Sequence, residues 1–323
     1  MGTLLNGPQR HFANLGVLWW VAVGIILMVF PIFLSKFWLY LITFMLIQAL
    51  FAVSFNLIMG YGGMISFGHA AFFGIGAYAV ALLSARTSLP FALILISAPV
   101  VGGLLALIIG FFCLRSHGLY FALLTMVFAE MLYHVVHKWY NFTGGDNGIQ
   151  GIPLPFFLET QASYYYFVLF LVVVGIILVW RIVNSPFGNA VMAFRENEER
   201  TDFVGINTMK LRLEAFSISG LYSGLCGGLF ALLTQQVSPD VMFWTKSAEP
   251  IFMGLFGGMY TFFGPIVGAI AIVFLEQFIS AHTKYWAIFM GLIILPVVLF
   301  LPEGLYGTFE RRIKAMIRRR GEI

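Results

Sequence analysis

The 323 residues are 60% hydrophobic and 10% charged, with a mean hydropathy of +0.93 and a formal net charge of +4 at pH 7. The 18 basic and 14 acidic side chains are too few to cover a water-soluble domain with this much apolar material, so composition excludes a soluble globular protein. Runs of about 20 apolar residues instead predict an all-α, polytopic membrane helical bundle, because a helix satisfies its own backbone hydrogen bonds within lipid.

The first apolar run covers residues 15–34. It is longer than the core of a secretory signal, about 7 to 15 residues, and no small-residue cleavage pattern follows it, so we expect a retained anchor. Nine further candidate segments follow, at 38–59, 64–84, 90–112, 118–137, 162–180, 213–235, 247–258, 263–281 and 285–302. The segment 247–258 is too short to cross alone, which predicts a half-helix buried in protein and about eight to ten membrane segments in all.

Lysine and arginine predict the orientation, because cytoplasmic loops carry an excess of them. With both termini in the cytoplasm, 13 of the 18 fall on the cytoplasmic side. The other five fall on the outer side, at Lys36, Arg86, Lys138, Lys246 and Lys284. We therefore predict cytoplasmic termini and a basic cytoplasmic tail at 303–323. Orientation and contact with anionic lipid account for this charge without a nucleic acid partner.

Glycine is dense in one predicted helix-turn-helix, at residues 56–78. Its Met59–Met64 stretch resembles Met253–Met259, which is either an internal repeat of the kind found in transporters or a chance match between common residues. The spacing Gly220-xxx-Gly224 predicts close helix packing further along the chain. Small residues at the two glycine turns either line a translocation path or let helices pack closely. The candidates are Gly62, Gly63, Ser66, Gly68, His69, Gly257 and Gly258.

Ionisable residues within membrane segments are costly and therefore candidates for function. Glu130 has His134 and His137 on the same predicted helix face, and Glu276 lies near the outer end of its segment. Glu130 and the histidines could form a proton relay, or Glu130 could make a helix–helix hydrogen bond. No further ligand set accompanies them, so we predict no metal site. The rest of the path is expected to lack a central charge, which is typical of a weakly selective conduit.

The stretch Arg181–Glu214 interrupts the apolar pattern and holds five basic and five acidic residues. Ser185-Pro186 predicts a helix start. Apolar residues then recur with helical spacing, which predicts one amphipathic helix flanked by mixed charges, at Phe187, Ala190, Val191 and Phe194. An apolar ridge with a charged rim is typical of docking into a groove of a partner. A helix on the lipid interface and a solvated connector are the alternatives.

Four blocks in order along the chain resemble permeases of bacterial branched-chain amino acid ABC importers. They are SPFGNAVMAFRENEERTDFVGINTMKLRLEAFSISGLYSGLCGG (185–228), NLIMGYGGMISFGHAAFFGIGAY (56–78), GLYFALLTMVFAEMLY (118–133) with TGGDNGIQGIP (143–153), and MGLFGGMYTFFGPIVGA (253–269). Glu199 and Gly205 keep the spacing of the family's cytoplasmic coupling loop, although Arg200 and Thr201 replace its two alanines.

The resemblance implies a single transmembrane permease domain, 1–323, with a coupling loop at about 185–210 that docks an ATPase. The implied docking residues are Phe187, Phe194, Arg195, Glu196, Glu198, Glu199 and Gly205. It also implies a second homologous permease, two ABC ATPase subunits and an extracytoplasmic substrate-binding protein as partners, in the bacterial inner membrane. The sequence has no G-x-x-x-x-G-K-[ST] phosphate loop, so ATP and Mg are expected on the partners and no cofactor on this chain, which is not expected to be an enzyme.

The expected cargo is a branched-chain or other small hydrophobic amino acid, moved into the cytoplasm by alternating access. Urea or amides are an alternative cargo, because related permeases resemble one another whatever they carry. A proton-coupled secondary transporter that uses Glu130 is the alternative mechanism.

Overall fold

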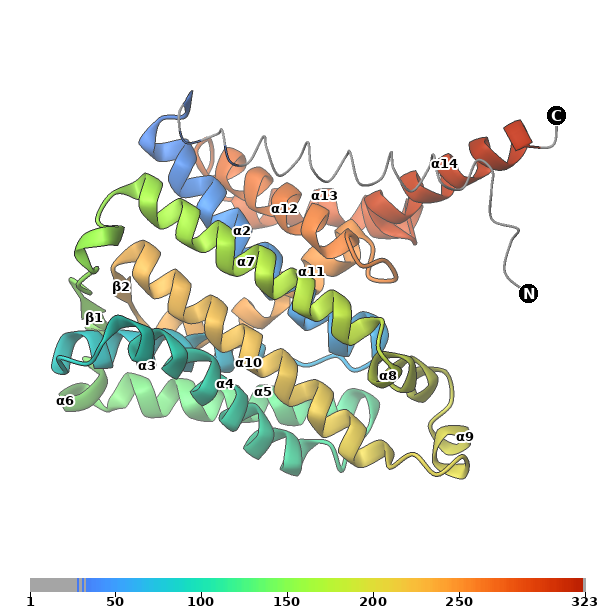
Figure 1. Cartoon of the computed structure of the whole chain (residues 1–323), viewed down its shortest axis with the longest axis horizontal. Helices are drawn as coiled ribbons and strands as arrows, with labels where there is room; N and C mark the ends of the chain where they lie inside the picture. Colours follow the sequence, from blue (N-terminus) through green and yellow to red (C-terminus); the bar gives the residue numbers. More distant parts are fainter. Residues whose placement is uncertain (1–27, 29–30, 32, 322–323) are drawn as a thin grey trace, which may run out of the picture.

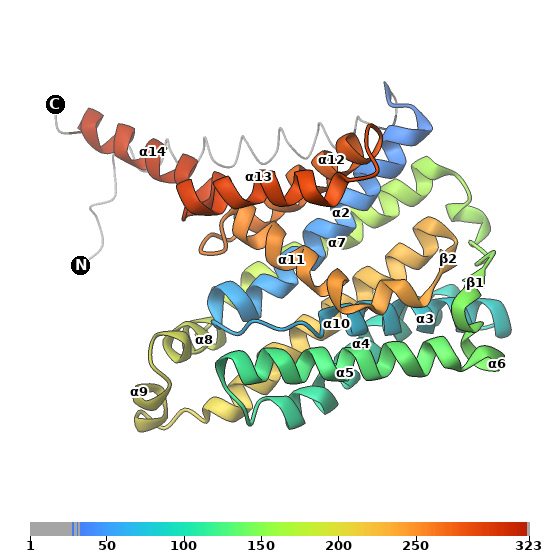
Figure 2. The same ribbon diagram turned by 180° about the vertical axis from the view of Figure 1, so that it is seen from behind.

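The computed structural model describes residues 28, 31 and 33–321, without the side chains of residues 313–321. Within this part, the chain is a bundle of helices that run roughly side by side (Figures 1 and 2). The prediction of an all-helical bundle is confirmed. Most of the first predicted segment, 15–34, lies outside the described residues.

Seven helices of the described part are long and apolar enough to cross a membrane. They are α2 (Lys36–Asn56) with the π-helical turn Leu57–Tyr61, α3 (His69–Arg86), α4 (Phe91–Cys113), α5 (Gly118–Lys138), α7 (Gln161–Val183), α10 (Thr208–Thr234), and Trp286–Arg312, which contains α13 (Trp286–Phe300) and the start of α14 (Gly304–Gly321). The apolar helix α12 (Gly264–Ser280) is shorter, and α11 (Trp244–Gly257) has only 14 residues. The predicted segments match these helices to within about three residues, except at the starts of α3 and α10, where the predicted boundary differs by about five.

Helix α10 lies at the centre of the bundle, against α2, α3 and α4 (Figure 1). Small residues allow this approach. A Cβ added to Gly224 would overlap the Ala98 carbonyl oxygen, and one added to Gly220 would overlap the Ala106 side chain. The sequence prediction that Gly220-xxx-Gly224 permits close helix packing is confirmed.

Two helices, α3 and α11, begin near the middle of the bundle rather than at its ends. The first residue of α3, His69, contacts Ser219 near the middle of α10 (3.0 Å), and the Ala70 N–H donates to Ser247 Oγ in the first turn of α11 (2.8 Å). The stretches that precede them, 62–68 and 235–243, contain no α-helix. The half-helix prediction for 247–258 is confirmed.

The predicted start of the third segment, at residue 64, is wrong. Hydrogen bonds outside any helix satisfy the backbone here: the Phe67 N–H donates to Thr125 Oγ1 and the Gly68 N–H to Ser66 Oγ, each at 3.1 Å. Non-helical backbone is tolerated at membrane depth when it is buried in protein and paired in this way. Apolar composition alone does not reveal the break.

The two ends of the bundle differ in structure (Figure 1). At one end β1 (Ile149–Gln150) pairs with β2 (Gln236–Val237) in an antiparallel register, Ile149 opposite Val237, near α6 (Tyr140–Thr143). At the opposite end lie α8 (Pro186–Glu196), α9 (Glu198–Phe203) and α14. The loop and the tail that were both predicted to be cytoplasmic thus share one end of the molecule.

Candidate functional site

The predicted coupling loop forms two short helices. α8 begins after Ser185, whose Oγ accepts a hydrogen bond from the Gly188 N–H (3.4 Å), as the cap residue predicts. Asn197 has extended backbone, and its Oδ1 accepts the Arg200 N–H (2.8 Å), which starts α9. The charged residues from Glu198 to Asp202 therefore belong to a second helix, because Asn197 acts as its N-cap, whereas Arg195 and Glu196 end α8.

The apolar stripe of α8 faces the bundle. Val191 and Phe194 are 2% and 9% exposed, and the half-buried Phe187 packs against the same cluster. The Arg212 guanidinium lies 5.2 Å from the centre of the Phe194 ring. An outward ridge formed by Phe187 and Phe194 is therefore wrong: the stripe anchors α8 to its own chain, because a short amphipathic helix is stabilised chiefly by burying its apolar side.

Other residues form the outward surface. Phe203 and Val204, at the end of α9, are 89% and 72% exposed, and Glu196 and Glu199 are exposed beside them. Gly205, with φ +87°, then turns the chain toward α10. An exposed aromatic and aliphatic pair with a charged rim is typical of a protein–protein contact. The sequence analysis missed Phe203 and Val204 because they do not continue the stripe of α8.

Arg195 links α8 to two turns that end membrane helices. Its guanidinium donates to the Gly60 carbonyl oxygen (2.5 Å) and lies 4.6 Å from the centre of the Tyr260 ring. A Cβ on Gly63, which has φ +66°, would lie 3.0 Å from Arg195 Cγ. Arg195 therefore contacts the turn after α2 and the turn after α11 together.

These two turns are the segments that resemble each other in sequence, and they contact one another directly. A Cβ on Gly60 would overlap the Met259 carbonyl oxygen, and one on Gly254 would lie 2.5 Å from Met59 Cε. Both turns therefore lie on the same side of the bundle. The contact explains why both carry glycine, since any side chain would separate the two backbones.

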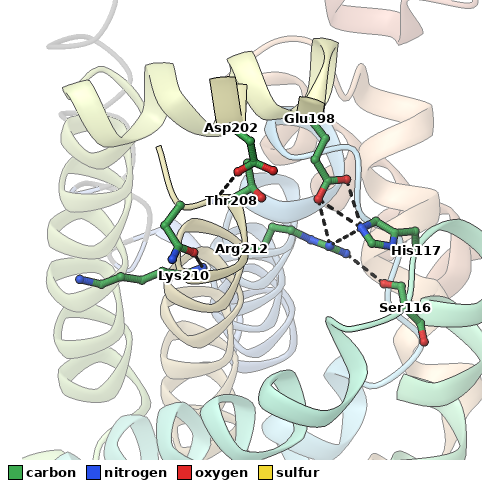
Figure 3. Close-up of polar contacts among 8 residues, drawn as sticks. Ser116, His117, Glu198, Asp202, Thr208, Lys210 and Arg212 are labelled. Carbon is green, nitrogen blue, oxygen red and sulfur yellow. Dashed lines mark hydrogen bonds and ion pairs between the residues drawn. The ribbon is translucent and has the colours of Figure 1, made fainter. Parts of the chain in front are cut away.

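A buried arginine ties α9 to the bundle, as Figure 3 shows. Arg212 Nη1 lies 2.9 Å from His117 Nε2 and 3.6 Å from Glu198 Oε1, and its Nη2 donates to the Ser116 carbonyl oxygen (3.1 Å). Glu198 Oε2 lies 3.1 Å from the same histidine nitrogen. Glu198, predicted to meet the ATPase, instead joins α9 to α10 and to the α4–α5 turn. The sequence analysis missed Arg212 and His117.

The start of α10 is fixed to the same segment. The Thr208 N–H donates to Asp202 Oδ1 of α9 (3.3 Å), and Asn207 Oδ1 caps the helix by accepting the Lys210 N–H (2.9 Å). Because α10 is the central helix, a displacement of α9 acts directly on the core of the bundle.

His69 and its neighbours form an enclosed polar contact. The Ser219 hydroxyl donates to the Ser54 carbonyl oxygen (2.7 Å), so it accepts from His69 Nε2 (3.0 Å). The other ring nitrogen then accepts from Ser66 Oγ (3.1 Å), and both side chains are fully buried. A Cβ on Gly68 would lie 2.9 Å from the Thr125 carbonyl oxygen. Of the two roles left open, these contacts support the packing role.

The remaining predicted glycines also lie at close backbone contacts. Gly62 and Gly257 are buried, and a Cβ would lie 2.8 Å from the Ile58 carbonyl oxygen at the first and overlap that of Gly264 at the second. Gly258 has φ +120° and lies against the Glu303 carbonyl at the start of α14. These contacts support packing rather than path lining.

Glu130 has a structural partner. Its Oε1 accepts the Trp244 N–H at the start of α11 (3.3 Å), where a carboxylate is favoured by the helix dipole. His134 lies 3.9 Å from the carboxylate, and His137 lies 3.8 Å from Asp146 instead. The described residues contain no group of three or more potential metal ligands. Of the two alternatives, the hydrogen bond between helices is the one observed.

Glu276 belongs to a charged group that the sequence analysis did not find. It interacts electrostatically with Glu249 and Lys246 of α11. Lys246 Nζ lies 2.6 Å from Glu249 Oε1, and Gln48 of α2 donates to Glu249 Oε2 (3.0 Å). A charged group therefore lies within the bundle, and Lys246 lies on the half-helix α11 rather than in an outer loop. The i, i+3 spacing of Lys246 and Glu249 was the available signal.

The chain is similar in sequence to known proteins. The family model described as "Branched-chain amino acid transport system / permease component" matches residues 37–298. The chain belongs to this permease family. The "High-affinity branched-chain amino acid transport system permease protein LivM" of Salmonella typhimurium is 28% identical over 91% of this chain and 76% of its own length, and so is that of Escherichia coli. A "Probable branched-chain amino acid transport permease protein LivM" of Methanocaldococcus jannaschii is 26% identical over 79% of this chain and 88% of its own length.

No solved structure matches the chain. The family match confirms the resemblance inferred from the four sequence blocks, and it covers nearly all of α2, every helix from α3 to α12 and nearly all of α13. Membership in the branched-chain permease family makes this chain a multi-pass transport permease, the translocation subunit of a transport system.

Proposed function

We propose that this permease carries branched-chain or other small hydrophobic amino acids into the cytoplasm by alternating access, as a subunit of an ATP-driven ABC importer in the bacterial inner membrane. The observation that carries the proposal is the two-sided character of α8 and α9. Their inner side is bound to two membrane-helix turns and to α10, whereas their outer side exposes Phe203 and Val204.

The partners follow from this arrangement and from the family. ATPase subunits, which hold ATP and Mg, dock on the exposed face of α9 and the adjoining Glu196, Glu199 and Gly205. A second permease of the same family completes the pathway. An external substrate-binding protein delivers the amino acid at the opposite end of the bundle, where β1 and β2 lie.

A movement of the docked ATPase reaches the membrane helices through two routes. The contacts of Arg195 transmit the movement to the turns that follow α2 and α11. The contacts of Glu198 and Asp202 transmit it to α10. The half-helix α11 begins near the middle of the bundle and ends in one of these turns. A tilt of α11 therefore changes the helix packing in the middle of the bundle. This geometry supports a rigid-body mechanism in which the cytoplasmic and outer ends open in turn.

The substrate class is supported by the names of the relatives and by the apolar lining of the bundle. Relatives from two bacteria and one archaeon are named as branched-chain amino acid permeases. A urea or amide importer would share the architecture and differ only in cargo.

Uptake into proteoliposomes tests the proposal. The full chain, co-purified with its partners and supplied with the binding protein, is expected to accumulate L-leucine only when ATP is present on the ATPase side. A protonophore is expected to leave the initial rate unchanged. Uptake that needs no ATP and collapses with the protonophore would establish the secondary-transport alternative. ATP-driven uptake of urea or acetamide but not L-leucine would establish the alternative cargo.

A further inference from the structure

A cavity lies between α2, α3, α10 and α11, close to the starts of α3 and α11. Four phenylalanines form its apolar part. Their rings contact in series, with centroids 5.8 Å apart for Phe44 and Phe230, 5.5 Å for Phe230 and Phe73, and 5.2 Å for Phe73 and Phe51. This part offers an apolar side chain a surface of flat rings.

The opposite part of the cavity is charged and polar. It is lined by Lys246 and Glu249, which form the 2.6 Å ion pair, and by Gln48, which donates to Glu249. Gln48 is 3% exposed, and its Oε1 has no hydrogen-bond partner among the described residues. A buried acceptor without a donor is costly, so this atom marks a position suited to a donor from a ligand.

The charged pair lies deep in the bundle. Gln48 is near the middle of the continuous helix Lys36–Tyr61, and Lys246 and Glu249 are in the first turns of a helix that begins at mid-bundle. Charges at membrane depth are rare and usually mark a substrate or ion path. The Gln48–Glu249 hydrogen bond is enough to tie α2 to α11, and that structural role leaves the unsatisfied amide oxygen of Gln48 unexplained.

A hollow leads to this cavity from the end of the bundle that carries β1 and β2. It has a volume of about 190 Å³, is lined by Asn147, Gln150 and Gln236, and shares Phe230 and Val241 with the cavity. The cavity itself has a volume of about 10 Å³, room for one water molecule. A solute therefore enters it only when the surrounding helices separate, as alternating access requires.

We propose that this cavity holds a zwitterionic amino acid during translocation, an inference that rests on the function proposed above. The α-carboxylate of the solute binds Lys246 Nζ, its α-ammonium group binds the Glu249 carboxylate and Gln48 Oε1, and its side chain lies on the four phenylalanine rings. One ion pair within the protein is replaced by two pairs with the solute. The Lys246–Glu249 pair and the zwitterion each carry no net charge, so binding adds no unpaired charge to the bundle.

Competition binding tests the inference on the unaltered protein. The full chain, co-purified with its partners in lipid nanodiscs and without the external binding protein, is incubated with radiolabelled L-leucine. Unlabelled L-leucine is expected to compete roughly 10- to 100-fold better than 3-methylbutylamine, which lacks the carboxylate, or 4-methylpentanoate, which lacks the ammonium group. Equal competition by all three, or the absence of saturable L-leucine binding, would overturn the inference.

Variants assign the two charges. Lys246→Gln is expected to abolish the preference for L-leucine over 3-methylbutylamine, and Glu249→Gln the preference over 4-methylpentanoate. Gln48→Met is expected to weaken L-leucine binding several-fold with the ion pair retained. Lys284→Gln, an exposed lysine in the turn before α13, is the matched control. If the pair were only structural, Lys246→Gln and Glu249→Gln would weaken binding of all three compounds alike.

The outcomes separate this inference from the proposed function. ATP-driven uptake of L-leucine together with equal competition by the three compounds would refute the zwitterion site alone. Failure of the complete transporter to take up any amino acid would refute the proposed cargo, and the site with it.

Discussion

Replacing Arg195 with methionine removes both contacts between α8 and the two glycine turns, the hydrogen bond to the Gly60 carbonyl and the ring contact with Tyr260. A hydrogen bond from a charged donor contributes about 1.5–3 kcal/mol, and a cation–π contact at an exposed site about 0.5–1 kcal/mol. Arg195 is an exposed residue, so the lower ends apply and the link is worth about 2 kcal/mol. That energy corresponds to roughly a 30-fold change in the equilibrium between the state in which α8 is bound to the two turns and the state in which it is not.

The expected phenotype of Arg195→Met is uncoupling. In proteoliposomes the variant is expected to insert, bind the ATPase and hydrolyse ATP, while the amount of L-leucine moved per ATP falls roughly 10- to 30-fold. Arg181→Met, an exposed arginine at the end of α7, is the matched control and is expected to couple normally. Wild-type coupling by Arg195→Met, with normal assembly, would refute the assignment of Arg195 as the link.

Three further variants probe the surrounding structure. Gly205→Val forces a β-branched residue to φ +87°, at a cost of about 1–3 kcal/mol. This variant is expected to lower transport and the stimulation of ATP hydrolysis, which an ATPase assay measures. Its abundance in the membrane, measured by immunoblot, is expected to stay unchanged. Glu198→Gln leaves the buried Arg212 with a weaker partner and is expected to lower the thermal unfolding midpoint, whereas Glu199→Gln, its exposed neighbour, is not. Gly224→Leu places a side chain against the backbone of α4 and is expected to abolish folding of the bundle. Gly291→Leu is the control and is expected to be tolerated, because nothing lies near an added Cβ there. Size-exclusion chromatography in detergent distinguishes the two outcomes.

The sequence predicts those parts of the fold that depend on local chemistry. Apolar length located the membrane helices, Ser185 located the start of α8, and the Gly220-xxx-Gly224 spacing predicted close packing. The short apolar run before Gly258 was correctly predicted to be a half-helix. In each case the deciding information lies within a few turns of the chain.

Long-range contacts could not be predicted in this way. Gln48 and Glu249 lie 201 residues apart in sequence, and Arg195 and Gly60 lie 135 apart. The periodicity of α8 identified an apolar stripe but not the surface that would cover it, so Phe194 was expected on the outside and lies on the inside. Glu198 was likewise expected at a partner and instead contacts Arg212.

Site-directed cross-linking tests the central claim most directly, that an ATPase docks on the exposed face of α9. The native Cys113 and Cys226 are both buried, so a cysteine introduced on the surface reacts selectively. With a short bifunctional reagent, the Val204→Cys variant is expected to cross-link to the co-purifying ATPase, whereas Phe156→Cys, at an exposed position in the segment between β1 and α7, is not. Cross-linking to the ATPase from position 156 and none from position 204 would contradict the account.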